Sequence, residues 1–238
     1  MHEKSDASTG GILPSGSSSS ISRFTLKEDR LYAVTETDLI TFSIADVHTI
    51  TEVNRIQISH ERSIETIYPM QQYLFLGAVT GMYVYDISNP DRPSYISQLN
   101  HAISCDPVVS QGNTAYVTLS SFGRNCNTGE NRLEVIDISD IQNPTVLQRY
   151  ALDTPGALAI DTNTLFVVVD TEGERNIKVL DVSTSENIQV RTTLIDARFR
   201  DILVSQKRLY ALAEDGLYIY DYANLDQIYL LGKYVQEN

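Results

Sequence analysis

The chain of 238 residues lacks any apolar run near the roughly 20 residues that a membrane-spanning helix needs. It is also poor in basic residues: 18 Lys and Arg stand against 31 Asp and Glu, which gives a net charge of -13. Such a chain repels phosphate backbones and lacks the basic patch that drives nucleic-acid binding. We therefore expect a protein that neither spans a membrane nor binds nucleic acid.

Local catalytic and metal-binding motifs are missing as well. The four histidines are scattered, and none forms a paired zinc spacing or a recognisable Ser/His/Asp arrangement. No Gly-rich phosphate loop or nucleophile elbow is present, and no acidic loop has calcium-loop spacing. We expect no metal and no cofactor, and a non-enzymatic protein is favoured over an enzyme.

The beginning of the chain lacks an apolar signal segment. Residues 1–20 are instead rich in Ser and Gly, with an unbroken serine run at 17–20. This composition predicts a flexible tail, followed by one domain over residues 21–238. A cytosolic protein would lack a signal segment, and so would an exported chain from which the signal had been removed, so both remain open.

The sequence does contain a recurring motif of six largely apolar residues, which we call the phrase. It occurs five times and is followed by a turn. The steps between successive phrases are 43, 51, 44 and 40 residues. A period of this length with strand-like content is typical of β-propellers, in which one repeat forms one blade. The phrases begin at Leu39, Met82, Leu133, Ile177 and Leu217.

Three further apolar segments surround the phrase in each repeat. They are short, rich in β-branched and aromatic residues, and separated by Gly, Asn, Asp or Pro, as strands are. In the second repeat the four segments are 64–70, 73–77, 82–87 and 94–99. We predict an all-β propeller, with five blades of four antiparallel strands. Packing of the last blade on the first, without a strand shared between the termini, is one way to close the ring, and the manner of closure stays open.

Two recurring positions are interpreted as structural. The second predicted strand of each blade carries an aromatic residue that should pack between neighbouring sheets. In four repeats the fifth residue of the phrase is an aspartate, whose side chain should accept backbone N–H groups of the following turn. The five aromatic residues are Tyr32, Phe75, Tyr116, Phe166 and Tyr210.

The third repeat is lengthened by about eight residues within 120–132. Insertions in one blade are often where repeat scaffolds gain specificity, and Phe122 and Arg124 are residue types that anchor interfaces. The insertion also holds Cys126, while Cys105 precedes the predicted inner strand of the same blade. A disulfide between them would fix the loop to its blade; a tolerated surface loop and two unpaired cysteines are the alternatives.

Two stretches of the chain resemble the LVIVD-repeat proteins, which are β-propellers of the bacterial cell envelope. One is Asp201-Ile-Leu-Val-Ser with Asp215-Gly-Leu-Tyr-Ile-Tyr-Asp, and the other is Asp106-Pro-Val-Val-Ser with Leu133-Glu-Val-Ile-Asp-Ile-Ser. The likeness spans about residues 22 to 236. The first repeat departs most, with a serine in place of the turn aspartate, and the fourth repeat lacks an Asn-Pro turn.

The resemblance implies four-stranded blades and, often, export with a lipid anchor at an N-terminal cysteine. This chain carries no such cysteine and no export signal, but its Ser-rich tail is similar to the spacer that follows an anchor. We therefore expect a trimmed exported protein of the cell envelope, periplasmic or surface-exposed, with any lipid anchor upstream of this chain. Members of the family share no established reaction, so the resemblance supplies no catalytic residue.

Candidate ligand-binding residues come from the geometry of propellers. Ligands usually gather at the mouth of the central channel, where every blade delivers a loop and the end of an inner strand. Mixed charges there suit a small polar ligand or a cation, although these residues could also pair with one another and with channel water. Alignment of the predicted inner strands brings five charged residues to the mouth, namely Arg23, Glu65, Asp106, Arg200 and Asp201.

These features predict a non-enzymatic binding or scaffolding propeller of a bacterial envelope that presents loops to a protein or a glycan. The alternative is an enzyme or sensor that acts on a small polar or carbohydrate ligand at the channel mouth. A monomer is expected, because the predicted outer strands carry polar or charged residues that discourage edge pairing. These residues are Arg55, Gln98, Arg149, Arg191 and Lys233.

Overall fold

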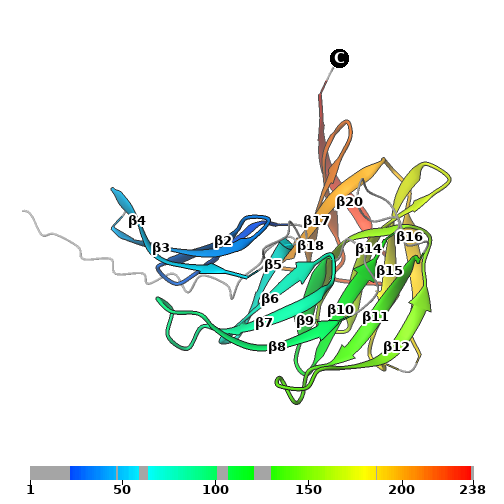
Figure 1. Ribbon diagram of the computed structural model, residues 1–238. Coiled ribbons are helices and arrows are strands. Elements are labelled where there is room, and N and C mark those ends of the chain that lie inside the picture. The colour runs from blue at the N-terminus through cyan, green and yellow to red at the C-terminus, as the bar shows by residue number, and fades with distance from the viewer. Residues whose placement is uncertain are drawn as a thin grey trace, which may run out of the picture.

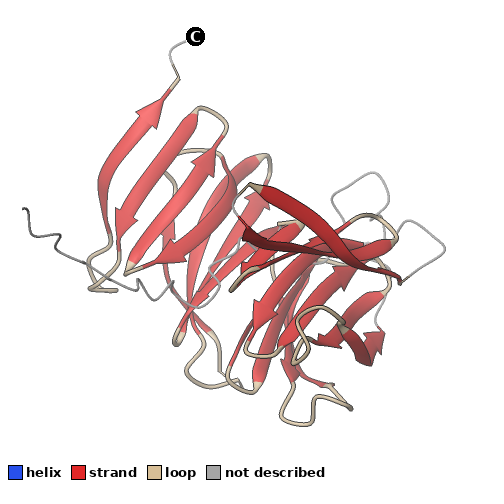
Figure 2. Cartoon of the chain, turned by 90° about the vertical axis from the view of Figure 1, so that its left-hand side faces the viewer, coloured by secondary structure: helices blue, strands red, loops and turns tan. Residues whose placement is uncertain are grey.

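The computed structural model describes residues 22–46, 48–58, 64–100, 107–120, 130–185 and 187–236. The predicted tail, Cys105, Cys126, Asp106, Phe122 and Arg124 lie outside these residues. The described residues form twenty strands and no helix, grouped in five antiparallel sheets of four strands each (Figures 1 and 2). The prediction of an all-β propeller with five four-stranded blades is confirmed.

Each blade follows the chain from an inner strand to an outer strand. Blade 1 consists of β1 (Phe24–Lys27), β2 (Arg30–Val34), β3 (Asp38–Asp46) and β4 (Thr49–Gln57). Blade 2 consists of β5 (Ile64–Met70), β6 (Tyr73–Ala78), β7 (Gly81–Asp86) and β8 (Ser94–Asn100). Blade 3 consists of β9 (Val108–Gln111), β10 (Thr114–Leu119), β11 (Arg132–Asp137) and β12 (Thr145–Ala151). Blade 4 consists of β13 (Pro155–Asp161), β14 (Thr164–Thr171), β15 (Glu174–Asp181) and β16 (Gln189–Leu194). Blade 5 consists of β17 (Phe199–Ser205), β18 (Arg208–Ala213), β19 (Gly216–Asp221) and β20 (Tyr229–Val235).

The repeated aspartate caps the turn after the third strand, as predicted. The backbone N–H of Ser139 donates to Asp137 at 2.8 Å, and that of Ser183 donates to Asp181 at 3.0 Å. Blade 1 has Ser43 at this position, and β3 there continues to Asp46, which accepts the N–H of His48 at 2.9 Å. The aspartate is therefore a structural feature of the repeat, and blade 1 makes the same kind of cap three residues later.

The core lies between the blades rather than within one central body. Because side chains alternate along a strand, each sheet has one face toward the preceding blade and one toward the following blade. Phe166 and Val179 of blade 4 are fully buried against blade 5, whereas Leu165 and Val167 are fully buried against blade 3. The aromatic residues of blades 1 to 4 all lie in such interfaces and are nearly fully buried.

The five blades form an open arc. In Figure 1 they run from blade 1 at the left, through blades 2 and 3 below and blade 4 at the right, to blade 5 at the top. The inner strands pack successively, β1 on β5, β5 on β9, β9 on β13 and β13 on β17. Among the described residues no comparable packing joins β17 to β1, so this structure does not show closure by packing of the last blade on the first.

Candidate functional site at the mouth of the arc

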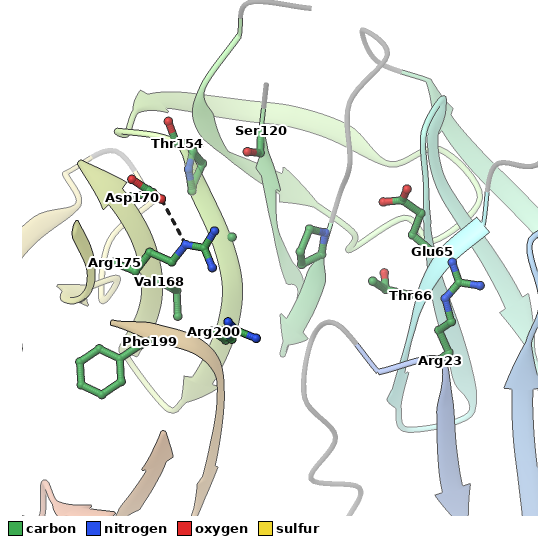
Figure 3. A pocket seen from close by; sticks show the side chains of 13 residues that line it. Arg23, Glu65, Thr66, Ser120, Thr154, Val168, Asp170, Arg175, Phe199 and Arg200 are labelled. Atoms are coloured by element: carbon green, nitrogen blue, oxygen red, sulfur yellow. Dashed lines mark hydrogen bonds and ion pairs between the residues drawn. The ribbon is translucent and has the colours of Figure 1, made fainter. Parts of the chain in front are cut away.

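A cavity of about 380 Å³ lies where the starts of the inner strands converge (Figure 3). Every blade contributes to its wall, because each inner strand begins at this end of the molecule. Such a volume falls within the usual range for small-molecule sites. The lining residues are Arg23, Glu65, Thr66, Pro107, Ser120, Thr154, Pro155, Gly156, Val168, Asp170, Arg175, Phe199 and Arg200.

Three of the five predicted mouth residues line this cavity. Arg23 comes from the segment before β1, Glu65 from β5 and Arg200 from β17. Asp201 is not among the lining residues, and its carboxylate accepts the backbone N–H of Ile202 at 2.8 Å. Asp106 lies outside the described residues, although the next residue, Pro107, lines the cavity. A ligand-binding role for these residues remains a prediction.

The wall formed by blades 4 and 5 carries a network of arginines and carboxylates. Arg175 donates to Asp170 at 3.1 Å and approaches Glu214 at 3.9 Å. Glu214 also pairs with Arg198 at 3.1 Å and with Arg200 at 3.5 Å. Since two carboxylates hold three arginines here, the network keeps the guanidinium groups in place and leaves an excess of positive charge.

The hairpin between β14 and β15 explains how Asp170 and Arg175 meet. They are directly paired across the antiparallel ladder, and Gly173 in the turn donates its backbone N–H to Asp170 at 2.8 Å. Glu172 and Gly173 both have positive φ, which the tight turn requires. Sequence reasoning missed this pair because it aligned inner strands only. The Asp-Thr-Glu-Gly-Glu-Arg stretch, read as a hairpin, was the available signal.

The opposite wall comes from blades 1 and 2. Figure 3 shows Arg23 and Glu65 across the cavity from Asp170, Arg175 and Arg200. Backbone bonds fix this wall: the N–H of Ile67 donates to the carbonyl of Ser22 at 2.9 Å, next to Arg23. The arrangement therefore places charged groups on two walls that belong to blades far apart in the sequence.

The third wall joins blade 3 to blade 4. Thr118 donates its hydroxyl to the carbonyl of Gly156 at 2.8 Å, which ties the end of β10 to the start of β13. Ser120, the last described residue before the insertion of blade 3, lines the cavity. The roles predicted for Phe122, Arg124, Cys105 and Cys126 stay predictions, because these residues lie outside the described ranges.

The charge of the mouth differs from that of the whole chain. Its lining holds three arginines and two carboxylates, whereas the whole chain carries a net charge of -13. Guanidinium groups bind carboxylates or phosphates through paired N–H donors, and carboxylates accept hydroxyl donors. Within the described ranges, no group of three or more His, Cys, Asp or Glu side chains is placed to hold a metal ion. The mouth is therefore suited to an anionic ligand that also carries hydroxyl groups.

Comparison with known proteins supports the fold and leaves the family open. No protein-family model matches the chain, and no curated protein matches it in sequence. A functionally unknown protein from Desulfotomaculum acetoxidans DSM 771 has a TM-score of 0.69 at 13% identity, over 93% of this chain and 70% of that chain. The periplasmic gluconolactonase PpgL from Pseudomonas aeruginosa has a TM-score of 0.65 at 15% identity, over 86% and 67%. BamB from Moraxella catarrhalis has a TM-score of 0.57 at 8% identity, over 90% and 63%.

At these identities the similarity shows a propeller fold alone. It does not show LVIVD repeats, a lipid anchor or a place in the envelope. The matched region spans only 63% to 70% of the length of these three propellers. The part of the chain that the structure describes contains no helix able to cross a membrane.

Proposed function

We propose that the protein is a non-enzymatic binding propeller of a bacterial envelope whose mouth cavity receives a carboxylate-bearing sugar at the end of a glycan. The observation that supports this most is the excess of arginine at the mouth of an acidic chain. Arg200 is more than half exposed, and Arg175 is held in place by Asp170. A sugar carboxylate would pair with these guanidinium groups, while its hydroxyl groups would donate to Glu65 on the opposite wall.

The envelope location rests on resemblance. The repeats resemble those of LVIVD-repeat envelope proteins, and a protein named as a periplasmic gluconolactonase shares the fold. A lipid anchor upstream of this chain is part of the same proposal. Presentation of the blade 3 insertion to a glycan or protein is part of the same proposal, which is supported by the position of Ser120 in the cavity wall.

Calorimetric titration with glucuronate and with glucose tests the proposal, because the two sugars differ mainly in the carboxylate. We expect the chain to bind glucuronate at least tenfold more tightly than glucose. Arg200→Ala and Arg175→Ala should each weaken glucuronate binding at least tenfold. Arg191→Ala, which removes an arginine paired with Asp181 away from the mouth, is the matched control and should bind as the unmodified chain does.

Equal binding of both sugars would refute recognition through the carboxylate, and binding of neither would refute the sugar-binding function. Binding that survives both arginine substitutions would place the site elsewhere on the molecule. The folded state of each variant is checked by circular dichroism, so that loss of binding is separated from loss of structure.

An enzyme acting on a small carbohydrate is the second candidate, and one observation favours it. Glu65 and Asp170 place carboxylates on opposite walls of the same cavity, as general acid–base catalysis of a sugar substrate would require. Hydrolysis of gluconolactone yields an acid that releases a proton, so the rate of proton release measures enzymatic activity directly. Turnover that disappears in Glu65→Gln and Asp170→Asn but persists in Asp181→Asn would replace the non-enzymatic proposal.

A further inference from the structure

The two ends of the arc leave opposite faces of the same kind of interface uncovered. In blade 4, Phe166, Val168, Ile177 and Val179 face blade 5 and are at most 5% exposed. Phe166 pairs across the ladder with Val179, and Val168 pairs with Ile177. These four side chains show what a blade normally buries against the blade that follows it.

Blade 5 carries the same arrangement, and no other blade among the described residues covers it. Tyr210 pairs with Ile219, and Leu212 pairs with Leu217, as their counterparts do in blade 4. Leu212 is 50% exposed and Leu217 is 36% exposed, and Tyr234, which pairs with Leu217, is 72% exposed. We call Tyr210, Leu212, Leu217, Ile219 and Tyr234 the free face of blade 5.

Blade 1 shows the complementary face, the one that the other blades bury against the preceding blade. Phe24 pairs with Ala33 and is 59% exposed, and Leu26 pairs with Leu31 and is 53% exposed. In blade 5 the residue that corresponds to Phe24 is Ile202, which is 1% exposed because blade 4 covers it. We call Phe24, Leu26, Leu31 and Phe42 the free face of blade 1.

We propose that the free face of blade 5 in one copy binds the free face of blade 1 in a second copy. The packing would repeat the blade-to-blade contact that the molecule already makes four times, from β1 on β5 to β13 on β17. Burial of such exposed aliphatic and aromatic side chains is the dominant favourable term in association. The second copy is the partner whose matching face the structure itself describes.

The proposed contact is heterologous, since a different face is used by each copy. A pair of copies therefore retains one free face of each kind, and further copies can add at higher concentration. The monomer was predicted because polar and charged residues on the outer strands discourage pairing between strand edges. The proposed contact is made between sheet faces, so it does not depend on such edge pairing. Since each copy carries a net charge of -13, added salt should strengthen the association by screening repulsion.

Sedimentation velocity with two face variants and their mixture tests this proposal. Leu212→Asp disables the free face of blade 5, and Leu26→Asp disables the free face of blade 1. Both side chains are at least half exposed, so neither change should unfold the chain. Leu147→Asp, at a 45% exposed position on the outer strand of blade 3, is the matched control.

We expect the unmodified chain and the control to form dimers and larger species as concentration rises. Each face variant alone should associate at least tenfold more weakly, whereas an equimolar mixture should form dimers with one copy of each variant and stop there. Circular dichroism and thermal melting confirm that each variant is folded.

Three outcomes would overturn the proposal. An unmodified chain that stays monomeric would show that a second copy does not cover these faces, and that the ring is completed by other means. Self-association of Leu26→Asp alone with no mixed dimer would show that blade 5 pairs with blade 5. Association unaffected by both substitutions would place the contact elsewhere.

Discussion

Blades 4 and 5 both have four strands and nearly the same sequence pattern, but among the described residues blade 4 packs on two blades and blade 5 on one. In blade 4 both faces of β14 are buried, with Val167 against blade 3 and Phe166 against blade 5. In blade 5 only one face of β18 is buried; Ala211 is fully covered, whereas Leu212 is 50% exposed. A residue of the repeat is therefore part of the core only where another blade covers it.

The stability of the propeller comes from contacts between consecutive blades. No single hydrophobic centre exists in the described structure, because the buried residues fall into clusters that each join two consecutive blades. Repeat proteins of this kind derive stability from contacts between nearest neighbours. The mouth cavity depends on the same contacts, since its walls come from all five blades.

Substitution of the equivalent aromatic residues gives the largest expected difference between the two blades. Phe166→Ala should lower the free energy of unfolding by about 3 to 5 kcal/mol, because it leaves a cavity at a fully buried site. The ring centroids of Phe166 and Tyr222 lie 4.9 Å apart there. Tyr210→Ala should cost about 1 kcal/mol, because that ring is partly exposed. Urea denaturation at low protein concentration measures both.

Equal losses for the two substitutions would contradict the comparison and would mean that Tyr210 is covered in solution. If the loss for Tyr210→Ala grows with protein concentration, a second copy covers it, as proposed above.

Two glycines at the start of the β15 and β19 hairpins should also differ. A Cβ at Gly216 of blade 5 would overlap the carbonyl oxygen of Tyr234, so Gly216→Ala should push β19 from β20 and cost about 3 kcal/mol. Gly173 of blade 4 also has positive φ, but nothing lies near its Cβ position, so Gly173→Ala should cost about 1 kcal/mol. Thermal unfolding of both variants measures the difference, and a greater loss for Gly173→Ala would contradict the close approach of β20 to Gly216.

A polar contact joins blade 4 to blade 5 beside the buried interface. Asp161 accepts Lys207 at 2.7 Å and the hydroxyl of Tyr222 at 3.0 Å. Burial would raise the pKa of Asp161, but hydrogen bonds from Lys207, Tyr222 and Thr162 outweigh it and lower the pKa. Asp161→Asn should cost about 1 kcal/mol, because Lys207 is largely exposed and solvent screens the pair.

Chemical denaturation of Asp161→Asn at neutral pH measures this loss. Asp153→Asn is the matched control, because Asp153 pairs with Lys178 at 3.5 Å and accepts the hydroxyl of Thr171 at 3.2 Å, both within blade 4. If Asp153→Asn loses as much stability, the contact that joins the two blades contributes no more to stability than a contact within one blade.

The sequence predicted the strands closely because each blade is a local unit with its own strand and turn signals. The segments predicted at 64–70, 73–77, 82–87 and 94–99 correspond to β5, β6, β7 and β8 within one residue at each end. The open arc could not be predicted in this way. The angle between successive blades depends on how two sheets pack, and the repeat period carries no information about that angle.

The site was predictable only in part for a similar reason. Inner-strand alignment identified Arg23, Glu65 and Arg200, which line the cavity. It also included Asp201, which does not line the cavity; β17 has a register irregularity between Phe199 and Asp201, and the consecutive residues Phe199 and Arg200 both line the cavity. Asp170 and Arg175 were missed because they come from the end of a hairpin between the second and third strands.

The smallest expected effect concerns the turn aspartate of blade 4. Hydrogen bonds from Ser183, followed by the ion pair with Arg191 at 2.5 Å, lower the pKa of Asp181 to about 2. Because the folded-state pKa lies below the unfolded value, the ionised carboxylate stabilises the fold above about pH 4, and this contribution is lost as the pH falls toward 2. NMR titration of the Asp181 carboxyl carbon should show the low pKa, and Arg191→Gln should raise it while leaving the Ser183 bonds intact. An unchanged pKa in that variant would mean that the hydrogen bonds from Ser183 alone lower the pKa of Asp181. The ion pair with Arg191 on the outer strand would then contribute nothing to it.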